Sequence, residues 1–196
     1  MLRRMTPIAT LAATENLLVL AAHPGEEALH CGGLIAHACA RGRPPLVALL
    51  TDGAAGPDAD ARAADLARRA HQAAAALGLP PARLFLFGLH PGAAADPVLH
   101  AALIEALCFL MWSRDCGVLV APPPGGPDHG AARDAAQAVA ARTGIGALAA
   151  EGAPFTPPAP AAVRKLAALA AYGLPPAPEA YGPLPPARLR MPRTSA

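Results

Sequence analysis

The fold of this chain is decided by the stretch at residues 17–27, which reads LLVLAAHPGEE. Its apolar half is typical of a strand that is covered on both faces, and the run stops at a His-Pro corner. Two carboxylates, Glu26 and Glu27, follow at once and would suit the positive end of a helix dipole. We therefore expect a buried strand that leads directly into a helix, and open α/β folds build their sites at corners of this kind.

The same alternation of apolar run and helical pattern continues along the chain. Apolar runs predict strands at residues 16–22, 46–50, 84–87, 118–121 and 145–150. Helical patterns separate them at residues 24–40, 61–77, 96–112 and 128–143. Strands that alternate with helices in this way predict a doubly wound, mostly parallel α/β sheet of the Rossmann-like type.

The composition changes at about residue 152, where Pro and Ala become dominant. Proline removes backbone donors and interrupts both helix and strand. We therefore expect a single α/β domain at residues 1–151, followed by a Pro/Ala-rich C-terminal tail at 152–196. The tail would pack as extended coil or remain mobile, except for a short helix at 162–172.

The charge and hydropathy of the chain argue against several classes of function. The net charge of +2 comes from scattered arginines with one lysine, without the basic stripe and interleaved aromatics of a nucleic-acid-binding protein. No apolar run approaches the roughly 18 residues of a membrane span, and Glu15 and Asn16 interrupt the N-terminal stretch that a signal peptide would need. The four cysteines form no CxxC pair, which favours free thiols in a reducing cytoplasm. We expect a cytoplasmic protein with a small-molecule partner, of unspecified oligomeric state.

Polar side chains follow three of the predicted strands and could share one site. His23 and Glu26 follow the first strand, Asp52 follows the second, and Asp128 and His129 follow the fourth. The carboxyl ends of parallel strands meet at one edge of a sheet, so these side chains are expected to converge. Two imidazoles and one carboxylate make a three-ligand zinc site with a position left open for water, whose pKa the metal lowers.

Other interpretations of these residues stay open at this point. Asp128 and His129 could simply cap a helix. Glu26 and His30 stand one helical turn apart, so they could form a different ligand pair or an ordinary contact on a helix surface. His90 lies in a loop that should line the mouth of a pocket, where it could contact a substrate.

The motifs also resemble the signature of a known family, the PIG-L/LmbE-like N-deacetylases. Residues 22–27, AHPGEE, followed by CGG at 31–33, are similar to that family's AHPDDE…CGG. Residues 50–56, LTDGAAG, resemble its second strand end, and residues 77–78 and 86–89 match its third segment more loosely. Pro127-Asp128-His129 resembles the end of its HPDH motif, and the matches keep the family's order across about residues 16–140.

The resemblance implies a zinc-dependent hydrolase that removes an acetyl group from an N-acetylated sugar or a related amide. It places His23 and His129 on two metal-ligand positions and Glu26 on the third, where the family usually has Asp. It gives Asp52 and Asp128 supporting roles around the ligands or their loops. It also implies a substrate-contacting arginine on the helix at 61–77, a role that we assign to Arg68, although the register also allows Arg69. With Asp52 and His90, Arg68 completes the predicted substrate-binding set.

Two departures from the family pattern concern catalysis. Gly25 occupies the position of the general base, and Gly126 occupies the first His of HPDH, which is associated with stabilising the oxyanion or the leaving group. General acid–base groups contribute about 10²–10⁴-fold each, so the loss of both would reduce turnover and leave metal binding intact. Asp128 and Glu27 are the candidates for a replacement catalytic carboxylate. The favoured hypothesis is an N-deacetylase with weak activity, and the alternative is an inactive pseudoenzyme that keeps the fold as a ligand- or partner-binding module.

Overall fold

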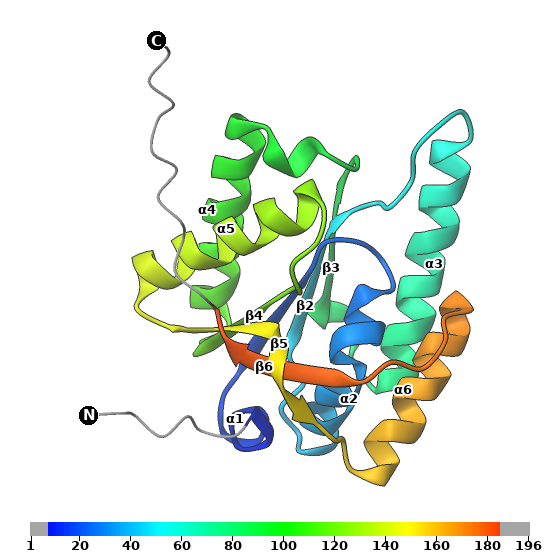
Figure 1. Ribbon diagram of the computed structural model, residues 1–196, viewed down its shortest axis with the longest axis vertical. Helices are drawn as coiled ribbons and strands as arrows, with labels where there is room; N and C mark the ends of the chain where they lie inside the picture. Colours follow the sequence, from blue (N-terminus) through cyan, green and yellow to red (C-terminus); the bar gives the residue numbers. More distant parts are fainter. Residues whose placement is uncertain (1–7, 185–196) are drawn as a thin grey trace.

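A computed structural model describes residues 8–184 and shows one six-stranded sheet with helices on both faces (Figure 1). The strands are β1 (Leu17–Ala21), β2 (Leu46–Thr51), β3 (Leu84–Leu89), β4 (Val118–Ala121), β5 (Gly146–Phe155) and β6 (Glu179–Pro183). The helices are α1 (Ile8–Thr14), α2 (Glu26–Ala40), α3 (Ala59–Leu77), α4 (Pro97–Ser113), α5 (Pro127–Thr143) and α6 (Ala159–Tyr172), with 3-10 turns η1 (Pro81–Arg83) and η2 (Ala93–Ala95).

The strand order β3-β2-β1-β4-β5-β6 places β1 in the centre of the sheet. Val19 of β1 pairs in parallel with Val47 of β2 on one side and with Val120 of β4 on the other. Strands β1 to β5 are parallel, and β6 alone runs antiparallel to its neighbour β5. The chain order reverses between β1 and β4, and the crevice beside such a switch point is the usual binding site of an open α/β sheet. The doubly wound fold predicted from the sequence is confirmed.

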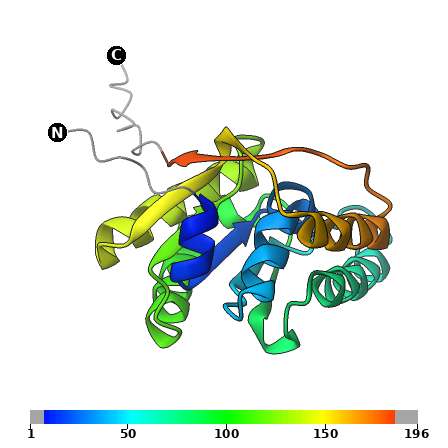
Figure 2. The ribbon, with the colours of Figure 1, turned by 90° about the horizontal axis from the view of Figure 1, so that it is seen from below.

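Two hydrophobic cores lie on opposite faces of the sheet, because successive side chains of β1 point to opposite sides. Leu17 and Val19 face the core beneath α2, α3 and α6, whereas Leu18 and Leu20 face the core beneath α4 and α5. The two helical layers are visible on either side of the sheet in Figure 2. Among residues 8–184, no helix combines the length and the apolar character that crossing a membrane requires.

The segment after residue 151 differs from the expected coil. The expected boundary falls inside β5, whose last residues pair with β6 as a two-stranded ribbon, and α6 packs against α2 and α3. The ribbon tolerates Pro154 because β4 pairs with β5 only up to Ala149, so Pro154 has one neighbouring strand. Coil was expected at residues 152–184 apart from a helix at 162–172, but residues 152–155 and 179–183 lie in strands and the helix begins at Ala159. Residues 185–196 lie outside the described part. Helix α1 was not anticipated either.

A buried ion pair attaches this segment to α2. Glu179 of β6 accepts hydrogen bonds from the backbone N–H groups of Gly33 at 2.6 Å and Leu34 at 3.2 Å, and its carboxylate lies 2.9 Å from Lys165 Nζ. Glycine is needed at position 33, because a Cβ there would lie 2.7 Å from the ring of Pro157. The helix that begins at the candidate site is therefore held by the C-terminal part of the chain.

Candidate metal centre

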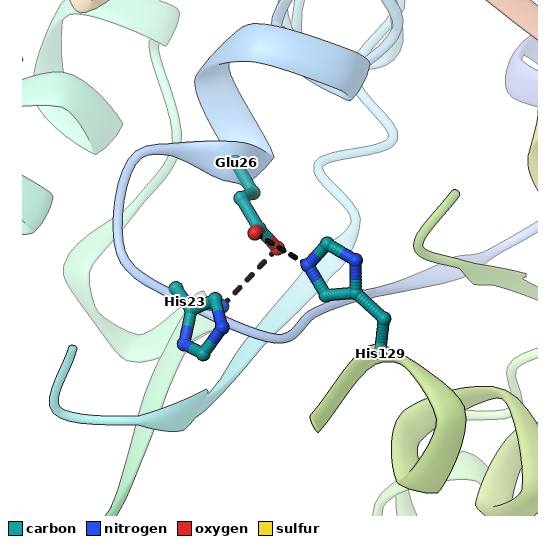
Figure 3. Close-up of side chains that lie close together, drawn as sticks. All are labelled: His23, Glu26 and His129. Carbon is teal, nitrogen blue, oxygen red and sulfur yellow. Dashed lines mark hydrogen bonds and ion pairs between the residues drawn. The ribbon is translucent and has the colours of Figure 1, made fainter. Parts of the chain in front are cut away.

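The corner after β1 folds the start of α2 back over the end of the strand. Glu26 is the first residue of α2, and its Oε2 atom accepts hydrogen bonds from the backbone N–H groups of Ala22 at 3.0 Å and of His23 at 3.2 Å. These bonds hold the carboxylate beside His23 and leave its other oxygen directed toward α5 (Figure 3).

Helix α5 follows β4, the neighbour of β1 in the sheet, and its first turn brings the second imidazole to this corner. His129 Nε2 lies 2.6 Å from Glu26 Oε1, and the His129 and His23 rings are 5.6 Å apart between centroids. His129, Glu26 and His23 each offer a ligand atom, and these three atoms lie within 4.8 Å of one another. The predicted ligand set thus converges, although the chain separates Glu26 from His129 by 103 positions.

The second nitrogen of His129 is buried and has no hydrogen-bond partner among residues 8–184. It lies against Gly125, where an added Cβ would be 1.9 Å from Nδ1, so the loop before α5 must carry glycine at that position. The ring is therefore fixed by close packing on this side, and its Nε2 atom faces Glu26.

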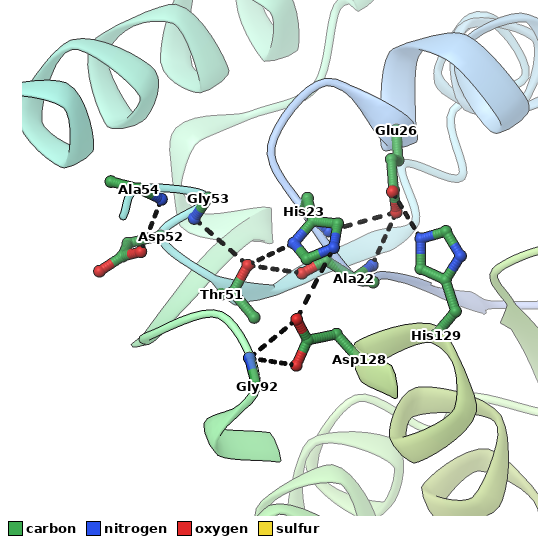
Figure 4. A network of polar contacts seen from close by, with 10 residues as sticks. All are labelled: Ala22, His23, Glu26, Thr51, Asp52, Gly53, Ala54, Gly92, Asp128 and His129. Carbon is green, nitrogen blue, oxygen red and sulfur yellow. Dashed lines mark hydrogen bonds and ion pairs between the residues drawn. The ribbon is translucent and has the colours of Figure 1, made fainter. Parts of the chain in front are cut away.

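Thr51 orients His23, a role that the sequence reasoning missed. The Thr51 hydroxyl lies 3.0 Å from the Ala22 carbonyl, which can only accept, and 2.7 Å from His23 Nδ1 (Figure 4). When the hydroxyl donates to that carbonyl, His23 Nδ1–H donates to the hydroxyl, and the Nε2 lone pair is left free to bind a metal. The pairing of β1 with β2 places Thr51 beside Ala22, and this register is visible only in the structure.

Asp128 lies on the opposite side of His23 from Thr51 and joins the α5 start to the loop after β3. Its Oδ2 atom is 3.8 Å from His23 Nε2. Both of its oxygens accept from the Gly92 N–H, at 2.8 and 3.0 Å. The side chain is almost fully buried, so Asp128 places a carboxylate near the cluster and also fixes the η2 loop.

Glu27 is buried behind the corner, with both oxygens occupied by the protein. Oε2 accepts from the Gly25 N–H at 2.8 Å, and Oε1 accepts from the Tyr172 hydroxyl at 2.7 Å. Burial raises the pKa of the Glu27 carboxyl to about 7, against the opposing effect of these hydrogen bonds. Its contacts join the start of α2 to α6, which is a structural role, and a catalytic role stays a prediction.

Of the three residues predicted to bind substrate, Asp52 and His90 lie on the Thr51 side of the cluster, and Arg68 lies away from it. Asp52 follows Thr51 directly, caps its own turn by accepting from the Ala54 N–H at 2.9 Å, and lies 3.0 Å from Nδ1 of the exposed His90. Arg68, by contrast, is exposed and contacts Asp65 and Gln72 on its own helix, and the structure does not bring it to the cluster.

The donor set of the cluster fits zinc. His nitrogen and Glu oxygen are ordinary zinc ligands, and three protein ligands leave a fourth position for a water or a substrate. Beside the cluster, a cavity of about 320 Å³ is lined by Thr51, Asp52 and Pro24 on one side and by small apolar residues of α3 with Leu86 on the other. The site therefore combines three side chains of the types that bind zinc with space for a small molecule.

The two glycines of the degenerate motifs have different environments. Gly25 has φ +100° at the start of α2, and a Cβ there would lie 3.1 Å from Leu174 Cδ1 and 3.6 Å from the Tyr172 ring. Gly126 has φ −66°, and a Cβ there would meet nothing within 4 Å. Neither position carries the carboxylate or the imidazole that the resemblance leads us to expect at residues 25 and 126.

Comparison with protein-family models gives a match over residues 18–140 to PIG-L, described as GlcNAc-PI de-N-acetylase. The match spans more than half of the chain. This chain belongs to the PIG-L family. Membership of this family supports a hydrolase of the deacetylase type. A search of curated proteins gives no significant match.

Solved structures with the same fold include the conserved protein TT1542 from Thermus thermophilus, with 26% identity and a TM-score of 0.61 over 81% of this chain and 79% of that one. The teicoplanin deacetylase Orf2, in a zinc-inhibited form, has 15% identity and a TM-score of 0.66 over 80% and 83% of the two chains. The N,N'-diacetylchitobiose deacetylase from Pyrococcus horikoshii has 15% identity and a TM-score of 0.66 over 81% and 70%. At 15% identity, the similarity to these two deacetylases shows a shared fold only.

Proposed function

We propose that this PIG-L-family protein is a zinc-dependent N-deacetylase that acts on an N-acetylated sugar or a related small amide. The observation that carries the proposal is the convergence of His23, Glu26 and His129 from two separate strand ends. Helix α2 supplies Glu26 and α5 supplies His129, so the ligand set depends on the whole fold and not on one local motif.

Each protein group at the site would have its own part in the reaction. Zinc, when bound by the triad, supplies Lewis acidity toward water and toward the amide carbonyl. Thr51 keeps the Nε2 lone pair of His23 free to bind the metal, and Asp128 would offer Oδ2 as the proton acceptor, because position 25 carries no carboxylate. Water adds to the carbonyl carbon, the C–N bond breaks, acetate departs, and the amine nitrogen takes a proton.

The substrate would use the cavity beside the cluster. Its lining by Thr51 and Asp52 continues directly from the His23 side of the site, and His90 lies at its rim through the contact with Asp52. A cavity of about 320 Å³ is at the lower end of the usual size for a small-molecule site, which suits one sugar ring.

A second candidate function has specific support from the two glycine positions. With Gly25 and Gly126 in place of a base and an oxyanion donor, the metal site could bind a ligand without turning it over. The alternative is therefore a pseudoenzyme that retains the metal and the cavity as a binding module.

Metal content and amine release separate these possibilities. The purified protein should contain about one zinc per chain by elemental analysis, and His129→Ala should lose it, whereas His71→Ala on the exposed surface of α3 should not. Zinc-free protein that also takes up no added zinc would contradict both functions. Given bound zinc, release of amine from a panel of N-acetyl sugars supports the deacetylase, and binding of those sugars without release supports the pseudoenzyme.

A further inference from the structure

Helix α4 carries large apolar side chains on its outer side as well as on the side that faces the sheet, which is unusual for a helix on the outside of a monomer. Its inner side packs into the core through Leu103, Leu107 and Met111, as expected for a helix that covers a sheet. A helix that is hydrophobic all round is normally buried all round. Among residues 8–184, α4 packs against the sheet, α5 and η2, as its place beside α5 in Figure 1 shows. Val98, Phe109 and Trp112 of its outer side remain exposed.

The outer side carries a continuous stripe, which we call the α4 stripe: Val98, Ala101, Ala102, Glu105, Phe109 and Trp112. All six residues are exposed, and helical geometry places them within one face about 100° wide. Val98 is 77% exposed, Phe109 62% and Trp112 79%, and the two aromatic rings lie 6.2 Å apart between centroids. Large side chains occupy one end of the stripe and small ones the other.

We propose that the α4 stripe is the interface of a twofold-symmetric homodimer, in which two copies of α4 pack antiparallel about an axis at Glu105. In this arrangement Trp112 of one copy meets Val98 of the other, and Phe109 meets Ala101. Each aromatic side chain thus faces a smaller one, as a self-complementary isologous interface requires. The inference concerns the surface of α4 and does not depend on the proposed function.

The charges on this face are complementary to themselves under the same symmetry. Glu105 is the single charged residue of the stripe, and it is already paired with Arg142 of α5 in the same chain. A twofold axis at Glu105 brings the Glu105–Arg142 pairs of the two copies together. The Arg142 of each copy can then bind the Glu105 carboxylate of the other copy as well as its own. A second copy fits this neutral, apolar stripe better than a nucleic acid or an anionic membrane, since each of those would need several basic residues.

The first test measures the mass of the full-length protein in solution. Sedimentation velocity over a concentration series should show a species of twice the 19.7 kDa chain mass. Trp112→Glu should weaken self-association by at least about 30-fold, since an interface tryptophan is a typical hot spot. The matched control is Val163→Glu on α6, which removes another exposed apolar side chain, 66% exposed, and should leave the dimer intact. A wild-type protein that stays monomeric, or a dimer unaffected by Trp112→Glu, would overturn the proposal.

The second test reports the orientation of the two helices. A cysteine introduced by Glu105→Cys would face its own copy across the axis, within reach of a disulfide under mild oxidation. The expected result is a covalent dimer well above the background that Cys39 and Cys108 give in the unmodified protein. Asp60→Cys on the exposed start of α3 is the matched control and should give background only. Equal cross-linking of the two variants would contradict an axis at Glu105.

Discussion

Gly25 and Gly126 depart from the family pattern in the same way but differ in what surrounds them. Gly25 adopts a left-handed backbone conformation, and its open side is filled by Leu174 and Tyr172. Gly126 has an ordinary extended conformation with free space around it. Position 25 requires glycine because of its backbone conformation and its packing, whereas position 126 has room for a side chain without rearrangement. A carboxylate at position 25 would therefore require changes in the backbone and the packing, whereas an imidazole at position 126 would not.

The largest effect is expected for the contacts of Glu179, which attach residues 156–184 to α2. This segment includes Tyr172 and Leu174, which lie against Gly25. Glu179→Gln leaves Lys165 as a buried charge without its counter-ion, which should lower the free energy of unfolding by about 3–5 kcal/mol. Denaturant titration measures this change. Asp65→Asn, which breaks an exposed ion pair on α3, should leave the free energy of unfolding nearly unchanged. Equal stability of both variants would show that residues 156–184 contribute little to holding α2.

The next largest effect is expected at position 25 and tests whether this position requires glycine. Gly25→Asp should lower the free energy of unfolding by about 1–3 kcal/mol, because a side chain is strained at this backbone conformation. It should also give no gain in amine release, because the new side chain points toward Leu174. Gly25→Ala is the matched control for the strain without the charge. A stable Gly25→Asp variant with raised turnover would refute the contrast between the two glycines.

A smaller effect is expected at the residue that orients His23. Thr51→Val keeps the shape of the side chain but removes the hydroxyl that binds His23 Nδ1, so zinc affinity should fall by about 10–100-fold. Competition with a chelator of known affinity measures the change. Thr143→Val, which removes a hydroxyl at the far end of α5, should keep the wild-type affinity. Unchanged binding in Thr51→Val would mean that His23 is held by other contacts.

The smallest effect on stability is expected at Gly126. Gly126→His should change the free energy of unfolding by no more than about 0.5 kcal/mol, since the new side chain meets free space. If the protein is a deacetylase with a missing oxyanion donor, the same variant should raise amine release in the zinc-loaded protein. Loss of stability comparable with that of Gly25→Asp would show that the two positions do not differ.

The sequence predicts much of this site because its main features are local. The buried run of β1, the His-Pro corner and the strand–helix alternation all indicate the fold before any contact is known. They also bring His23, Glu26 and His129 to one edge, as parallel strands must. Thr51 was missed because its role depends on a register between β1 and β2, which residue types alone do not specify.

The C-terminal elements could not be predicted for a different physical reason. Strand β6 reads Glu-Ala-Tyr-Gly-Pro, which shows neither an alternating pattern nor a continuous apolar run. It is stabilised by partners distant in the chain, since Glu179 binds the backbone of α2 and Tyr181 donates to the His30 carbonyl at 3.0 Å. Proline-rich composition indicated coil, and long-range contacts decided otherwise.

The bond between Glu179 and the backbone at Gly33 also limits how the C-terminal part of this chain could be exchanged for another. The family match ends at residue 140, yet α2 is bound to a strand that begins about forty residues later. A chimaera that joined residues 1–140 to a C-terminal segment without a carboxylate at the place of Glu179 would keep His23, Glu26 and His129 and lose this attachment. A change at Gly33, Pro157 or Glu179 would therefore require a matching change at the other two residues.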